Sequence, residues 1–81
     1  MEILINVING KSGEIRQFRY ENNFEKAIRK IQYLKSRMKI GNDIFQYEFF
    51  YYDENSEIEK CKTFEDFNSF KIALEEVCKW N

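Results

Sequence analysis

The stretch FQYEFFYYDENSEIE, from Phe45 to Glu59, decides the fold of this chain. Six of the eight residues from Phe45 to Tyr52 are aromatic, and acidic residues follow directly. Side chains of a β-strand alternate between its two faces, so the aromatic residues divide into two sets. The set that predicts a core strand consists of Phe45, Tyr47, Phe49 and Tyr51. The opposite set, which includes Phe50 and Tyr52, is surplus to a single core.

The segment before this strand predicts a hairpin. Residues 3–8 are mostly β-branched and apolar, the turn-rich NGKSGE follows, and IRQFRY alternates again. A loop tip at Lys11-Ser12 sets the register. It places Val7 opposite Arg16, Ile5 opposite Phe18 and Ile3 opposite Tyr20. After the aromatic strand, DENS predicts a turn and EIEKCK a short fourth strand.

Two helices complete the pattern. The first has an apolar stripe at helical spacing, is capped by Asn22 or Asn23, and ends before Gly41. Asn22 with Glu25 three residues later has the spacing of a capping box. This first stripe consists of Phe24, Ala27, Ile28, Ile31, Leu34 and Met38. The second helix is predicted to begin at Thr63, and its stripe consists of Phe64, Phe67, Phe70, Leu74, Val77 and Cys78.

The element order ββαββα predicts one α+β domain over residues 1–81. The expected architecture is a four-stranded, mainly antiparallel sheet with two helices packed on one face. The strand order stays open, as does the direction of pairing where the hairpins meet. No further element remains to cover the second face of the sheet, so its apolar residues form a predicted interface, and a homodimer is one version of it. These residues are Leu4, Ile8, Ile15, Phe50 and Tyr52.

Composition excludes several classes of protein. An apolar content of 43% is ordinary for a globular chain, and no apolar run reaches the roughly 20 residues that span a bilayer. The start MEILINVING lacks the basic segment and cleavage site of a signal peptide. We therefore expect a cytoplasmic protein without membrane contact. Cys61 and Cys78 are expected to remain free thiols, because the predicted second helix separates them.

Catalytic chemistry has few candidates here. The chain contains no histidine, which removes histidine bases, Ser-His and Cys-His pairs and most zinc sites. The fragment GKSG at residues 10–13 lacks the earlier glycine of a phosphate-binding loop and precedes a strand rather than a helix. The acidic pairs lie in turns and on expected helix surfaces. We therefore expect a protein that is not an enzyme and needs no cofactor or metal.

Charge divides the chain into two halves. Residues 1–40 contain nine Lys/Arg and four Asp/Glu, whereas residues 41–81 contain four Lys and ten Asp/Glu. The second half therefore predicts an acidic and aromatic surface that binds a protein partner with a basic cleft. Its candidate residues are Phe50, Tyr52, Asp53, Glu54, Glu57, Glu59, Glu65 and Asp66. The first helix predicts an alternative nucleic-acid-binding face, formed by Lys26, Arg29, Lys30, Tyr33 and Arg37.

In size, in residue usage (Lys, Asn, Ile, Phe, Tyr) and in its compact ββαββα outline, the chain resembles small inhibitor proteins of phages and mobile elements, such as anti-CRISPR proteins. The resemblance implies a non-enzymatic inhibitor that blocks a bacterial defence nuclease in the host cell by occluding its nucleic-acid-binding surface. The partner would then be a nucleic-acid-handling effector complex. Two alternatives remain open: a small nucleic-acid-binding regulator that uses the basic helix, and a structural subunit of a larger assembly.

Overall fold

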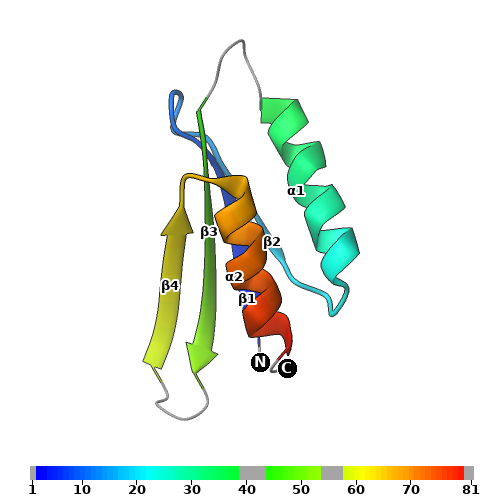
Figure 1. Ribbon diagram of the computed structural model, residues 1–81. Coiled ribbons are helices and arrows are strands. Elements are labelled where there is room, and N and C mark those ends of the chain that lie inside the picture. Colours follow the sequence, from blue (N-terminus) through cyan, green and yellow to red (C-terminus); the bar gives the residue numbers. More distant parts are fainter. Residues whose placement is uncertain (1, 39–43, 54–57, 80–81) are drawn as a thin grey trace.

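The computed structural model describes residues 2–38, 44–53 and 58–79. The strands form one sheet in the order β2-β1-β3-β4, and each neighbouring pair is antiparallel. Both helices lie on the same face of this sheet and run in opposite directions (Figure 1). The predicted α+β fold is therefore confirmed. The elements are β1 (Ile3–Asn9), β2 (Ile15–Arg19), α1 (Phe24–Met38), β3 (Phe45–Asp53), β4 (Ile58–Phe64) and α2 (Phe67–Lys79).

The β1–β2 hairpin has the register that its sequence predicts. Ile5 pairs with Phe18, and the Tyr20 amide N–H donates to the Ile3 carbonyl at 2.9 Å. The turn between the strands needs Gly13, whose φ of 81° lies in the left-handed region that favours glycine. The amide of Gly13 donates to the Asn9 carbonyl at 2.8 Å. The GKSG fragment is thus part of a hairpin turn.

The two hairpins meet at β1 and β3, whose pairing the sequence left open. These strands pair antiparallel over the whole of β1, from Ile3 opposite Tyr51 to Asn9 opposite Phe45. They are the most apolar strands of the four, and they occupy the interior of the sheet. The edge strands β2 and β4 carry arginine, lysine and glutamate instead. Charged side chains at sheet edges disfavour pairing with further strands.

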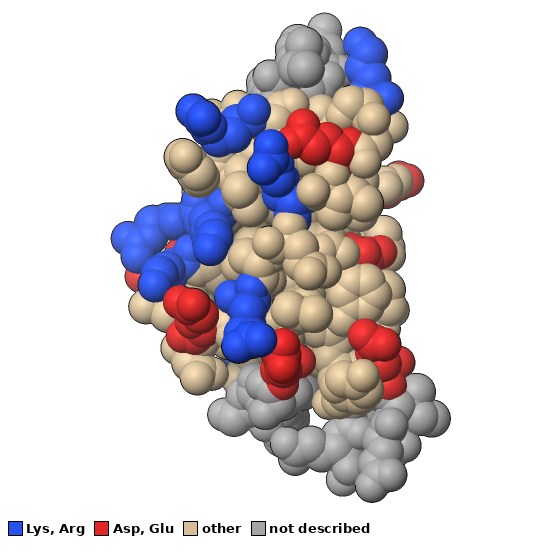
Figure 2. All heavy atoms as spheres, turned by 180° about the vertical axis from the view of Figure 1, so that it is seen from behind, with Lys and Arg blue, Asp and Glu red and all other residues tan. Residues whose placement is uncertain are grey.

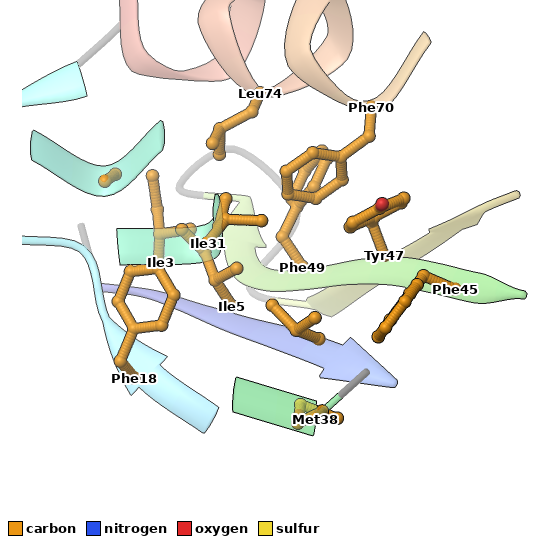
Figure 3. Close-up of a cluster of buried hydrophobic side chains, with 12 residues drawn as sticks. Ile3, Ile5, Phe18, Ile31, Met38, Phe45, Tyr47, Phe49, Phe70 and Leu74 are labelled. Carbon is orange, nitrogen blue, oxygen red and sulfur yellow. The ribbon is translucent and has the colours of Figure 1, made fainter. Parts of the chain in front are cut away.

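The core lies between the sheet and the helices. Figure 3 shows Phe70 projecting from α2 toward the aromatic side chains of β3, and Leu74 projecting toward Ile31. From α1, the buried residues are Ala27, Ile31 and Met38. The sheet contributes Ile3, Ile5, Val7, Phe18, Phe45, Tyr47 and Phe49. The predicted apolar stripes of both helices therefore face the core.

The helix starts differ in part from the predictions. Asn23 caps α1, because its Oδ1 accepts the Lys26 amide at 3.0 Å. Asn22 has a φ of 58° and precedes the cap, so the proposed capping box at Asn22 does not form. Gly41, the expected end of this helix, lies outside the described residues.

The predicted start of the second helix at Thr63 is wrong. Thr63 and Phe64 belong to β4, where they pair with Glu48 and Tyr47 of β3. Asp66 caps α2 instead, since its Oδ2 accepts the Ser69 amide at 3.0 Å. Thr63 suits both a helix cap and a strand, and the pairing with β3 decides between them.

Candidate functional site

The strongest candidate surface is the face of the sheet that the helices leave open, here called the outer face. In the view of Figure 2, most residues in its middle are uncharged, and Lys and Arg gather on the side of β2. Leu4 pairs with Phe50 and Ile8 with Ile15 on this side. Ile15 and Tyr52 are each 57% exposed, and the other three are half-buried. The five surplus apolar residues therefore share one face, as predicted.

A shallow depression lies at one end of the outer face. It has a volume of about 140 Å³. Leu4, Phe50, Tyr51 and Tyr52 line it together with the acidic residues Glu2 and Glu59. Glu2 is paired with Arg19 at 3.2 Å. Aromatic residues beside a carboxylate thus form one end of the outer face.

A polar row crosses the middle of the outer face. Asn6 Nδ2 donates to Glu48 Oε1 at 2.8 Å, and Thr63 Oγ1 donates to Glu48 Oε2 at 3.0 Å. Asn6 is only 6% exposed, and its Oδ1 has no hydrogen-bond partner among the described residues. Burying an acceptor without a donor is unfavourable. The row is therefore a polar network that lacks one donor.

Sequence reasoning missed this row. Asn6 and Glu48 are 42 residues apart, and only the pairing of β1 with β3 brings them together. The sequence does show that Asn6 and Glu48 are polar residues inside mostly apolar strands. The sequence did not place these residues opposite each other, because it left the direction of the β1–β3 pairing open.

The predicted acidic residues are distributed over two ends of β4. Glu59 lies at its start, opposite Tyr52 on the outer face. Glu65 and Asp66 follow its end, six residues further along, which is about 20 Å in a strand. Asp66 also has a structural role: hydrogen bonds from Ser69 to its carboxylate lower its pKa as it caps α2. Asp53 is the last residue of β3, and Glu54 and Glu57 lie outside the described residues.

The predicted basic residues of α1 also separate. Lys26 and Lys30 face β2, where they line a small depression of about 70 Å³ with Phe18 and Arg19. The Lys30 Nζ lies 5.0 Å from the centroid of the Phe18 ring, a cation–π distance. Lys26 is paired with Glu21 at 3.3 Å.

The other three predicted residues of α1 do not line this depression. Arg29 instead lines a groove of about 440 Å³ between the helices, together with Lys71 of α2. Tyr33 is 60% exposed, and Arg37 is exposed as well. Sequence reasoning did not assign Arg19 to this surface, because the neighbourhood of β2 and α1 depends on the fold.

The cysteines are free, and they lie on different elements. Cys61 is opposite Phe50 on the outer face, whereas Cys78 belongs to α2 on the other side of the sheet. Burial raises the pKa of both thiols, and Glu48 raises that of Cys61 further. Burial and the neighbouring Cys78 raise the pKa of Tyr20 to about 12. The raised pKa of each thiol disfavours its thiolate form at neutral pH.

Within the ranges 2–38, 44–53 and 58–79, no group of three or more Cys, Asp or Glu side chains is arranged to hold a metal ion. None of the helices in these ranges is long and apolar enough to cross a membrane. Comparison with known proteins found no matching family model, and no significant match among curated proteins or solved structures.

Proposed function

We propose that the protein is a non-enzymatic inhibitor that binds another protein through the outer face. The observation that carries this proposal is the open apolar surface of the sheet. Five large apolar residues remain exposed or half-buried there, while the opposite face packs against two helices. Aromatic residues such as Phe50 and Tyr52 are enriched at protein interfaces and often carry much of the binding energy.

The proposed target is a protein that handles nucleic acid, in line with the resemblance to anti-CRISPR inhibitors. Glu59 lies next to Tyr52 on the outer face, and within the described part of the chain no cation pairs with it. A carboxylate beside exposed aromatic groups fits a cleft with basic walls, because complementary charge speeds association and sets specificity. Occupying such a cleft would exclude its nucleic acid. The site of action would be the cytoplasm of the host bacterium.

A comparative capture experiment tests this proposal. The tagged protein is incubated with bacterial lysate that contains candidate defence complexes, with and without nuclease, and the bound proteins are identified by mass spectrometry. We expect one stoichiometric partner that survives nuclease treatment. The double variant Phe50→Ser, Tyr52→Ser is expected to lose it, with affinity reduced at least about 25-fold, because truncating even one aromatic hot-spot residue costs about 2 kcal/mol or more.

The matched control is Ile72→Ser, which changes an equally apolar residue that is 66% exposed on α2, on the other side of the sheet. This control is expected to keep the partner. Capture that is equal for the wild type and the Phe50/Tyr52 variant would remove the proposal. If the captured partner forms a stable assembly with this chain in a fixed ratio, the chain is instead a structural subunit of that assembly.

One observation favours a second candidate function, nucleic-acid binding. The fold adds Arg19 of β2 to Lys26 and Lys30 of α1 around a single depression, which enlarges the basic face that the sequence predicts. Exposed Tyr33 on the same helix offers a ring on which a base can stack.

This candidate predicts binding to a single-stranded oligonucleotide that weakens steeply with salt, by a slope of about −0.7 in log K per phosphate contact. The variant Lys30→Glu, Arg37→Glu is expected to abolish the binding, whereas Lys62→Glu on β4 leaves it largely intact. Fluorescence anisotropy at low and moderate salt measures both. Absence of binding by the wild type at low salt would eliminate this function.

A further inference from the structure

Glu48 occupies a distinctive position on the outer face. It lies on β3 two residues from Phe50, opposite Asn6 of β1 and Thr63 of β4. The hydrogen bonds of its carboxylate, at 2.8 and 3.0 Å, come from neutral groups. In residues 2–38, 44–53 and 58–79, no lysine or arginine forms an ion pair with it. The carboxylate therefore keeps an uncompensated negative charge amid an apolar surface.

The location of Glu48 restricts what can cover the outer face. Leu4 and Ile8 flank Asn6 on β1, and Gln46 and Phe50 flank Glu48 on β3. A partner that covers the apolar residues on both sides of this row must also cover the carboxylate. Removing a carboxylate from water without a compensating cation is strongly unfavourable. A partner that supplies a positive charge at the centre of this face is therefore favoured over one that does not.

The Asn6 side chain independently indicates that the outer face lacks a hydrogen-bond donor. Its orientation follows from chemistry, because only Nδ2 can donate to the Glu48 carboxylate. That leaves Oδ1 as a buried acceptor without a donor in the described part of the chain. This oxygen has almost no accessible surface, so a partner's donor reaches it only when the Asn6 side chain turns toward the surface. The Glu48 carboxylate is half-buried and can accept further hydrogen bonds directly. What the row lacks is a donor with several N–H groups.

We propose that the outer face recognises an arginine side chain of its protein partner, whose guanidinium pairs with Glu48 and supplies the donor that the Asn6 row lacks. This inference rests on the proposed function and specifies the partner's chemistry. Arginine fits better than lysine because its planar group presents five donors in a fixed fork and is more weakly hydrated. Its aliphatic stem would pack against Leu4, Ile8 and Phe50. Arginine is also a residue with which proteins hold phosphate groups, which agrees with a nucleic-acid-handling target.

Two short peptides test the proposal on the intact chain. Acetyl-Leu-Arg-Leu-amide is compared with the same peptide that contains citrulline, a neutral isostere of arginine, by two-dimensional NMR titration of the ¹⁵N-labelled protein. We expect the arginine peptide to shift the side-chain amide signal of Asn6 and the backbone signal of Thr63. The citrulline peptide is expected to bind at least about tenfold more weakly, because a hydrogen bond to a charged group contributes about 1.5–3 kcal/mol, which corresponds to tenfold or more.

The variant Glu48→Gln removes the negative charge and retains an amide oxygen that can accept the hydrogen bond from Asn6. We expect its affinity for the arginine peptide to be as low as the affinity of the wild type for the citrulline peptide. Glu76→Gln on α2 is the matched control and is expected to bind like the wild type. Equal affinity for the two peptides, or unchanged affinity in Glu48→Gln, would overturn the inference. Concentration-dependent shifts of the Phe50 and Tyr52 signals without peptide would overturn it too, since a second copy would then cover the face.

The two proposals fail separately. If the captured partner is lost with Phe50→Ser, Tyr52→Ser but kept with Glu48→Gln, the outer face binds protein and the inference of an arginine is wrong. If no protein partner depends on the outer face, the proposed function fails, whatever the peptides show. Thermal unfolding of each variant checks that the variant is folded under the conditions of the binding measurements.

Discussion

Replacing Phe70 with alanine is expected to lower the free energy of unfolding by about 4 kcal/mol, as for other fully buried aromatic residues. Phe70 is fully buried and joins α2 to the sheet, so its loss leaves a cavity that a rigid sheet cannot fill. Its ring is the centre of an aromatic cluster. The ring centroids of its neighbours lie at 5.5 Å for Tyr47, 5.8 Å for Phe49, 6.0 Å for Phe64 and 6.5 Å for Phe67.

Urea denaturation followed by circular dichroism measures this loss. The matched control is Ile72→Ala on the same helix, where the side chain is exposed and the expected change is within about 0.5 kcal/mol. A domain of this length has a total stability of about 4–12 kcal/mol, so Phe70→Ala can unfold much of the population. Phe70→Leu retains part of the packing and gives a smaller loss that remains measurable. Equal stability of Phe70→Ala and Ile72→Ala would contradict the packing described here.

The second large effect is expected at Asn9, where alanine should lower the free energy of unfolding by about 1–3 kcal/mol, the range for leaving buried polar groups unpaired. Asn9 is only 1% exposed. Its Oδ1 accepts the amides of Lys11 at 2.9 Å and Ser12 at 3.1 Å. Its Nδ2 donates to the carbonyl of Met38 at 3.1 Å. The side chain therefore joins the hairpin turn to the end of α1, and alanine would remove both connections.

The variant Asn9→Asp separates these two roles. Aspartate keeps an acceptor for the turn but places a carboxylate against the Met38 carbonyl. Burial and this carbonyl should raise the pKa of the new carboxyl in the folded state above its unfolded value. Protonation then favours folding, so the variant should regain stability as the pH falls through that raised pKa, relative to the wild type.

Gln32→Ala, an exposed substitution on α1, serves as the control for both variants at Asn9. Thermal and urea unfolding over a range of pH values supply the comparison. Loss of less than about 0.5 kcal/mol in Asn9→Ala, the usual size for a surface substitution, would show that these hydrogen bonds contribute little. If the difference in free energy of unfolding between Asn9→Asp and the wild type does not change with pH, the contact of this side chain with the Met38 carbonyl is contradicted.

Much of the fold could be predicted from local pattern. The pairing of Ile5 with Phe18 follows from alternation on both sides of a short turn, and the α1 stripe follows from helical spacing. These features depend on residues close together in the chain. The start of α2 could not be predicted in this way, because Thr63 has suitable chemistry for a cap and for a strand. Its pairing with Glu48, 15 residues earlier, decides the matter.

For the candidate site, the sequence by itself determined that Phe50 and Tyr52 lie on an uncovered face. Two helices can cover only one side of a four-stranded sheet, and period-two alternation assigns these residues to the other side. Only the tertiary structure decided what lies beside them. The antiparallel pairing of β1 with β3 brings Asn6 to Glu48 across 42 residues, and the length of β4 separates Glu59 from Asp66. These neighbour relations between strands depend on strand order and direction, and the alternation pattern within one strand does not specify either.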